Sequence, residues 1–195
     1  MVEVLDLRGS FGFLAFHGGN LERITDQIAS EAAARAGASF YGVLQPTGMR
    51  HHVSSKLVTP DQSPKLARFL DHCDVVVAIH GYGLHGRWAD LLLGGRNRVL
   101  ARHVGAHLRD QLPAYRILDD LDDIPHRLRG QHPDNPCNST RGGGVQIELP
   151  PRVRGLSPLA SYWPTRHDQT RRFAHVEHLI QGLADAARQW PTDAR

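Results

Sequence analysis

Two apolar segments of this chain end in the same way, with a histidine followed by a glycine. Residues 13–16 lead into His17, and residues 75–79 lead into His80. Both runs have the length and composition of buried strands. Two imidazoles and one carboxylate form the ligand set with which a catalytic zinc leaves a coordination position for water, and Glu22 closely follows the first histidine. The pattern indicates a zinc centre; the alternative is that each histidine only ends its strand and is satisfied by backbone groups.

The elements that must position these side chains are typical of an α/β fold. Apolar residues at helical spacing predict a helix over residues 21–36, with Asn20 as its N-cap and Gly37 as its stop. Residues 40–44 predict the next strand. Strand, helix and strand in this order indicate a parallel crossover unit. Since such folds place their sites at the carboxyl ends of the strands, Glu22 and the first histidine should face one cleft.

The rest of the chain continues the alternation of strands and helices. We expect an edge strand at residues 2–7, a short polar strand end at 50–55, helices over 60–70, 96–112 and 168–189, and strands over 91–93, 115–118 and 142–149. Val99 is predicted on the inner face of the second of these helices. Glu148 alternates with apolar neighbours and should point away from them. Residues 81–88 predict a loop over the cleft, and residues 119–137 predict irregular structure.

Length and composition restrict the class of protein. With 195 residues, 41% hydrophobic and 22% charged, the chain fits one globular domain over residues 1–195, built as a mixed, mostly parallel sheet flanked by helices. Two cysteines without a CxxC motif argue against a thiolate zinc site. All but two of the 23 basic residues are arginines, but they are scattered, which argues against a nucleic-acid partner. Arginine suits the binding of carboxylates.

The expected location follows from what the sequence lacks. No apolar run has the length of a membrane span, and the first residues lack the basic start and apolar region of a signal peptide. We therefore expect a cytoplasmic protein without a membrane partner, which would leave the cell only by lysis. We also expect a monomer.

Several short motifs in a fixed order resemble one known family. They span about residues 11–155 and comprise His17-Gly-Gly-x-x-Glu22, His52-x-x-Ser55, Val77-Ala-Ile-His80-Gly81, the turn Gly94-Gly95, Cys137-Asn138 and Gly144-Val-Gln-Ile-Glu148-Leu149. Together they resemble the phage-type poly-γ-glutamate hydrolase family. The resemblance implies a fold related to the zinc carboxypeptidases and zinc-dependent cleavage of γ-linked glutamate amides.

The same resemblance implies roles for individual residues. His17, Glu22 and His80 match the positions that hold Zn²⁺, and Glu148 matches the general base. Asn138 and Arg141 lie near the position where the wider carboxypeptidase group has an Asn-Arg pair that binds a substrate carboxylate.

The chain also departs from the family pattern. Gln27 stands where the family has a second acid, Ser139-Thr140 separates Asn138 from Arg141, and Arg96-Asn97 follows the glycine turn where an aspartate is common.

The working hypothesis is a zinc amidohydrolase acting on an anionic, glutamate-containing peptide or polymer. Arg87, Arg141 and Arg152 or Arg154 are expected to meet substrate carboxylates, and His52 is expected to contribute to the oxyanion environment or to a lid. The alternatives are a hydrolase of small acyl-amino acids or of peptidoglycan γ-glutamyl peptides on the same scaffold, or a binding domain that has lost its metal. A nucleic-acid binder would show a steep salt dependence of association.

Overall fold

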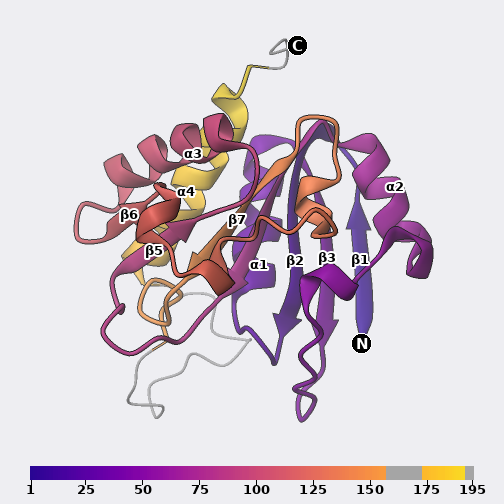
Figure 1. Cartoon of the computed structure of the whole chain (residues 1–195), viewed down its shortest axis with the longest axis horizontal. Helices are drawn as coiled ribbons and strands as arrows, with labels where there is room; N and C mark the ends of the chain where they lie inside the picture. The colour runs from indigo at the N-terminus through magenta and orange to yellow at the C-terminus, as the bar shows by residue number, and fades with distance from the viewer. Residues whose placement is uncertain (157–172, 192–195) are drawn as a thin grey trace.

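The structure, a computed structural model, describes residues 1–156 and 173–191. Seven strands form one mixed sheet in the order β1-β3-β2-β4-β7-β5-β6 (Figure 1). Strands β3, β2, β4 and β7 are parallel, whereas β1 and β5 run antiparallel to β3 and β7. The strands are β1 (Val2–Asp6), β2 (Gly9–Gly19), β3 (Ala38–Gln45), β4 (Val75–Gly81), β5 (Asp90–Leu93), β6 (Arg116–Leu118) and β7 (Gly144–Leu149). The predicted mixed, mostly parallel sheet is confirmed.

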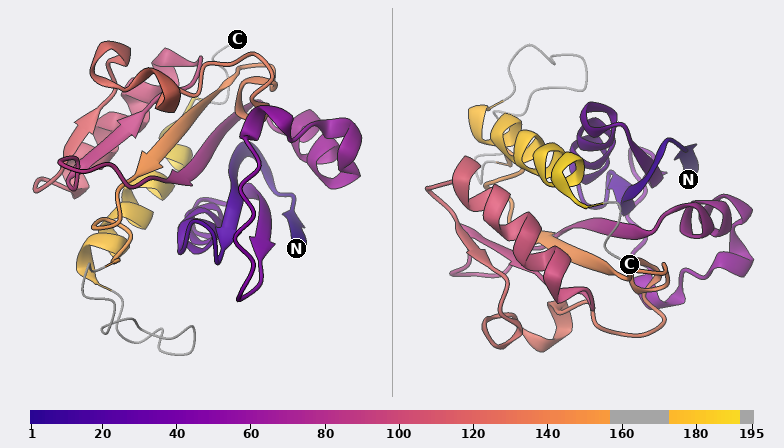
Figure 2. Two further views of the ribbon diagram at one scale, coloured as in Figure 1. Left: turned by 60° about the horizontal axis from the view of Figure 1, so that its bottom comes forward. Right: turned by 90° about the horizontal axis from the view of Figure 1, so that it is seen from above.

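Helices and irregular segments cover the two faces of the sheet differently. Figure 2 shows α1 (Thr25–Ala36), α3 (Arg98–Gln111) and α4 (Ala174–Gln189) on one face, and α2 (Pro64–His72) on the other face together with the segment after β6. In β4 and β7, odd-numbered apolar residues pack on the three helices, whereas even-numbered residues face the opposite side. The even-numbered face is therefore where polar groups such as Glu148 can meet a pocket.

The first helix begins later than the sequence pattern predicts. It starts at Thr25, because β2 continues to Gly19 and a tight turn follows, in which the Glu22 amide donates to the His17 carbonyl at 2.8 Å. Asn20 is not the N-cap, since its side chain donates to the Met49 carbonyl at 2.9 Å. The predicted stop at Gly37 is confirmed, and its φ of 67° explains why glycine stands there.

Other boundaries also differ in ways that capping explains. Ser63 accepts a hydrogen bond from the Leu66 amide and starts α2 at Pro64, after a separate 3₁₀ turn at Pro60–Gln62. The prediction for Val99 is wrong: the residue is 63% exposed, because the buried face of α3 runs through Leu100, Val104 and Leu108.

Three further segments complete the comparison with the predicted elements. Residues 50–55 contain no strand, and residues 119–137 contain 3₁₀ turns and irregular segments, as predicted for the latter. The predicted start of the last helix at residues 168–172 lies outside the described residues.

None of the helices in the described part of the chain is both long and apolar enough to cross a membrane. The extent of one domain over residues 1–195 stays a prediction.

Candidate metal centre and its pocket

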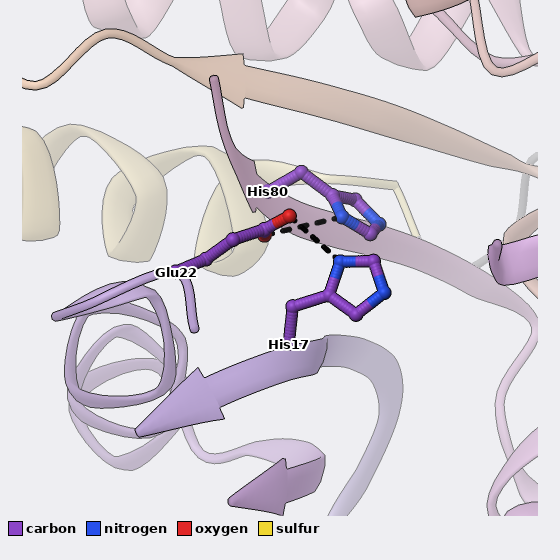
Figure 3. A group of neighbouring side chains, drawn as sticks. All are labelled: His17, Glu22 and His80. Atoms are coloured by element: carbon purple, nitrogen blue, oxygen red, sulfur yellow. Dashed lines mark hydrogen bonds and ion pairs between the residues drawn. The ribbon is translucent and has the colours of Figure 1, made fainter. Parts of the chain in front are cut away.

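Three predicted ligands converge at the carboxyl ends of the central strands (Figure 3). His17 comes from the end of β2, His80 from the end of β4, and Glu22 from the turn before α1. One ligand atom from each residue lies within 4.8 Å of the others. His17 Nδ1 lies 2.7 Å from Glu22 Oε1, and His80 Nδ1 lies 3.4 Å from Glu22 Oε2. The structure thus brings the three side chains into one cluster, with their ring nitrogens directed at one carboxylate.

The turn holds Glu22 firmly in this position. Its Oε2 also accepts a hydrogen bond from the Gly81 amide at 2.9 Å. Ile24, with φ 75°, is the one non-glycine residue with positive φ in the described part of the chain, and it closes the turn. Gln27, where the family has its second acid, lies on α1 and is not in the cluster.

Charge and burial act against each other on the cluster. Burial raises the pKa of Glu22, but the neighbouring His80 and His17 lower it more, so the net pKa is well below the usual range. For His80, burial lowers the pKa, and Glu22 followed by Glu148 outweighs it, so the net pKa is raised. The carboxylate is therefore ionised at neutral pH and available as a ligand.

The hydrogen bonds around His17 show that the donor set fits a metal ion. The Val53 carbonyl lies 2.8 Å from Nε2, and a carbonyl oxygen can only accept, so we infer that Nε2 carries the hydrogen. In a neutral ring, Nδ1 then directs a lone pair at Glu22 Oε1, and two acceptors face each other. Either a proton on Nδ1 or a metal ion bound by both atoms removes this conflict, so the donor set is compatible with a metal ion. Metal-binding histidines commonly donate their second N–H to such a backbone carbonyl.

Glu148 lies beside the cluster on β7, where it pairs in register with His80. Burial raises the pKa of Glu148 to about 7, despite the opposing effect of His80. Its Oε1 accepts a hydrogen bond from Gln146 Nε2 at 2.8 Å, and Asn135 Nδ2 donates to Gln146 Oε1 at 2.7 Å. This pair of amides fixes the orientation of the carboxyl group.

A cavity of about 680 Å³ connects these groups, within the range of pockets that hold drug-sized ligands. His52 lies in its wall, with its ring centroid 4.8 Å from that of His17. Burial lowers the pKa of His52, and His17 adds to this effect. His52 thus lies beside the metal cluster, and its role stays a prediction.

The structure does not bring Arg141 or Asn138 to the pocket. Arg141 precedes β7 and forms an ion pair with Asp74, which precedes β4, so both lie at the opposite edge of the sheet. Asn138 Nδ2 donates to the carbonyls of Gly130 and His132, and its Oδ1 accepts from a backbone amide. Asn138 thus holds the loop together, and the placement predicted for both residues is wrong.

Arg87 and Arg152 also lie outside the residues that line the pocket. Arg87 contacts Asp90 and donates to the Asp123 carbonyl at 3.2 Å. The Arg152 guanidinium lies over the Tyr115 ring, 5.3 Å from its centroid. Both cations therefore contact neighbouring groups of the protein outside the pocket. Their positions do not support the predicted contact with substrate.

Arg154 is buried beneath the cluster. Its Nη1 donates to the Arg23 carbonyl at 3.1 Å, directly after Glu22. A Cβ on Gly81 would lie 2.6 Å from Arg154 Cζ, so the guanidinium packs against this glycine. Burial lowers the pKa of Arg154 to about 10, although Glu22 and Glu148 oppose the change. Arg154 therefore stabilises the turn that carries Glu22.

Sequence reasoning missed more than half a dozen residues that line the pocket, and four of them with polar side chains are Lys56, Arg127, Asn135 and Gln146. Gln146 could have been found, because it precedes Glu148 by two positions and shares its face of the strand. The other three lie in segments without periodicity, where sequence carries no signal for which residues face a pocket.

Comparison with known proteins identifies the family. Residues 2–177 match the family described as poly-gamma-glutamate hydrolase. The chain belongs to this family. The resemblance predicted from the motifs is thereby confirmed. The UPF0714 protein YndL of Bacillus subtilis (strain 168) is 26% identical over 170 residues, which cover 84% of this chain and 64% of YndL. The chain thus spans less than two thirds of the length of this relative.

Solved structures share the fold. A bacteriophage poly-gamma-glutamate hydrolase is similar with a TM-score of 0.77 at 20% identity, over 95% of this chain and 86% of that one. The zinc-free form of YndL gives 0.77 at 19% identity, over 96% and 89%. An N-acetylmuramoyl-L-alanine amidase from Clostridium difficile 630 gives 0.52 at 13% identity, over 92% and 95%. At these identities the likeness shows the fold alone, and it confirms the predicted fold class.

Proposed function

We propose that this poly-gamma-glutamate hydrolase family member is a zinc-dependent enzyme that cleaves γ-glutamyl amide bonds. The observation that carries the proposal is the cluster of His17, Glu22 and His80, whose ligand atoms lie within 4.8 Å of one another beside the buried carboxyl of Glu148. A separate structural role for each histidine would not require both rings to face one carboxylate. The same observation argues against a binding domain that has lost its metal, because the ligand set is intact.

The chemistry divides between the ion and the protein. Zn²⁺ held by His17, Glu22 and His80 would lower the pKa of a bound water and polarise the scissile carbonyl. Glu148 acts as the general base: Gln146 occupies Oε1, so Oε2 accepts the proton of the attacking water and then donates it to the leaving nitrogen. In the metal-free protein, burial raises the pKa of this carboxyl to about 7, and a nearby Zn²⁺ would lower it.

The substrate class follows from the family and from the charge of the pocket. The family name describes hydrolysis of poly-γ-glutamate, and the related phage protein carries the same name. Lys56 and Arg127 line the pocket, so it suits an anionic chain of glutamates. Monomeric state, cytoplasmic location and the absence of nucleic-acid and membrane partners stay predictions.

Metal analysis combined with activity tests the proposal. Purified protein should contain about one zinc per chain and should hydrolyse γ-glutamyl oligomers. His80→Ala should lose both zinc and activity, whereas Glu148→Gln should keep zinc and lose about 10²–10⁴-fold in kcat. The control is His72→Ala, which should behave as wild type. His72 lies on α2, outside the pocket, and its ring nitrogen bonds the Arg8 carbonyl. Full activity in Glu148→Gln, or activity without any bound metal, would refute the mechanism.

A further inference from the structure

The pocket wall carries two cations, Lys56 and Arg127, that have no partner among residues 1–156 and 173–191. Lys56 and Arg127 both line the cavity and are exposed, and within the described residues neither side chain forms a hydrogen bond or an ion pair. Five arginines outside the cavity instead form ion pairs with acids: Arg8, Arg35, Arg109, Arg141 and Arg188. Unpaired cations at a concave site are suited to an anion from outside the protein.

The two cations approach the metal cluster from opposite sides. Lys56 belongs to the segment after β3, which is fixed to the β2 side of the cluster because the Val53 carbonyl bonds His17. Arg127 belongs to the segment after β6, which is fixed to the β7 and β5 side, since the Gly95 amide donates to the Arg129 carbonyl at 2.7 Å. In the sheet order, β4 with His80 lies between these two sides.

The remaining charges of the pocket do not neutralise this pair. Glu22 and Glu148 are the acidic residues among the described residues that line the cavity, and both are buried beside the histidines. Arg129 also lines it, but its Nε donates to the Ile124 carbonyl at 2.9 Å, so its guanidinium is already engaged. Lys56 and Arg127 are therefore the cations available to a ligand at the rim.

We propose that Lys56 and Arg127 bind the α-carboxylates of the two glutamates on either side of the scissile γ-amide. Each residue of a γ-linked glutamate chain carries one free α-carboxylate, so a bond placed at the cluster has one carboxylate on each side. One cation on each wall matches this arrangement. The inference rests on the proposed function and names the groups that make the site selective for γ-linked glutamate over neutral amides.

Paired substrates and paired variants test this assignment. The probes are a γ-glutamyl oligomer and the same oligomer with its α-carboxylates converted to amides. Lys56→Gln and Arg127→Gln should each lower kcat/KM for the acidic oligomer by about tenfold or more, as expected for a lost hydrogen bond to a charged group. Neither change should affect hydrolysis of the amidated oligomer. Arg102→Gln is the control, because Arg102 is also an exposed cation without a partner among the described residues but lies on α3, across the sheet.

Two results would overturn the assignment. One is that Lys56→Gln and Arg127→Gln lower kcat/KM for the acidic oligomer no more than Arg102→Gln does. The effect would then reflect only the net charge of the protein. The other is an equal loss on both oligomers, which would indicate structural damage.

A failure of the proposed function can be separated from a failure of this inference. If wild-type protein hydrolyses neither probe, the proposed function fails. Binding of the fluorescently labelled acidic oligomer, measured in the zinc-loaded Glu148→Gln background, then still decides the inference. Weaker binding on adding Arg127→Gln supports it, and unchanged binding refutes it.

Discussion

The strand ends and the loop wall of the pocket contribute to the same site by different physical means. His80 and Glu148 pair in the register of the parallel strands β4 and β7. His17 lies near the end of the neighbouring strand β2, where the pairing with β3 is irregular between Ala15 and Gly18. Lys56 and Arg127 lie on irregular segments, whose positions depend on a few contacts distant in sequence, such as the bond from Gly95 to Arg129. Residues on strands are therefore placed by local pattern, whereas residues on loops are placed by tertiary contacts.

Glu22 is the test of this comparison within the metal cluster, because it is the one ligand on a turn. Glu22→Gln should lower zinc affinity more than about 100-fold, a greater loss than changes around a ligand commonly cause. Gln27→Ala is the matched control, since Gln27 stands at the family's second acid but outside the cluster. Competition with a fluorescent chelator measures both. A loss of affinity in Gln27→Ala with none in Glu22→Gln would reverse the assignment of the ligand.

The burial of Glu148 on β7 should affect how the free energy of unfolding of metal-free protein depends on pH. The folded pKa of Glu148, about 7, lies above its model-compound value of 4.5, so its contribution to stability is complete below about 4.5 and is lost as pH rises through 7. Glu148→Gln lacks this loss. In EDTA, the stability of the variant relative to wild type should therefore rise by about 3 kcal/mol between pH 4.5 and pH 8. Urea unfolding at several pH values measures the difference, and parallel pH profiles would contradict it.

A glycine at the strand end should be sensitive, whereas a nearby loop glycine should not. Gly81→Ala places a methyl group 2.6 Å from Arg154 Cζ and should cost about 1–3 kcal/mol, with weaker zinc binding because Gly81 also donates to Glu22. Gly83→Ala is the control, since a Cβ there meets no atom within 4 Å. Thermal unfolding and zinc titration compare the two. Equal behaviour would show that Arg154 does not pack rigidly under the cluster.

The smallest effect is expected at the edge of the sheet opposite the pocket. Arg141→Gln removes an exposed ion pair with Asp74 and should change stability by less than about 1 kcal/mol, with unchanged kcat/KM. Arg127→Gln on the pocket wall should show the reverse pattern. A tenfold fall of kcat/KM in Arg141→Gln would restore the substrate role that the sequence pattern predicted for it.

The difference between strand residues and loop residues also explains which parts of the site could be predicted from the sequence. The apolar runs before His17 and His80 predicted both strands correctly, although β2 continues to Gly19. The alternation around Glu148 predicted its face. The prediction for Arg141 was wrong because this residue precedes β7. A residue before a parallel strand lies at the amino edge of the sheet, whereas the site lies at the carboxyl edge. The helix start was wrong because residues 20–24 form a turn whose hydrogen bonds to β2 leave no mark in hydrophobic periodicity.

Anomalous diffraction at the zinc edge, from crystals of zinc-loaded protein, tests the central claim most directly. The account predicts one strong peak about 2.0–2.2 Å from His17 Nδ1, His80 Nδ1 and a Glu22 oxygen. A peak coordinated by other residues, or none at these side chains, would contradict it.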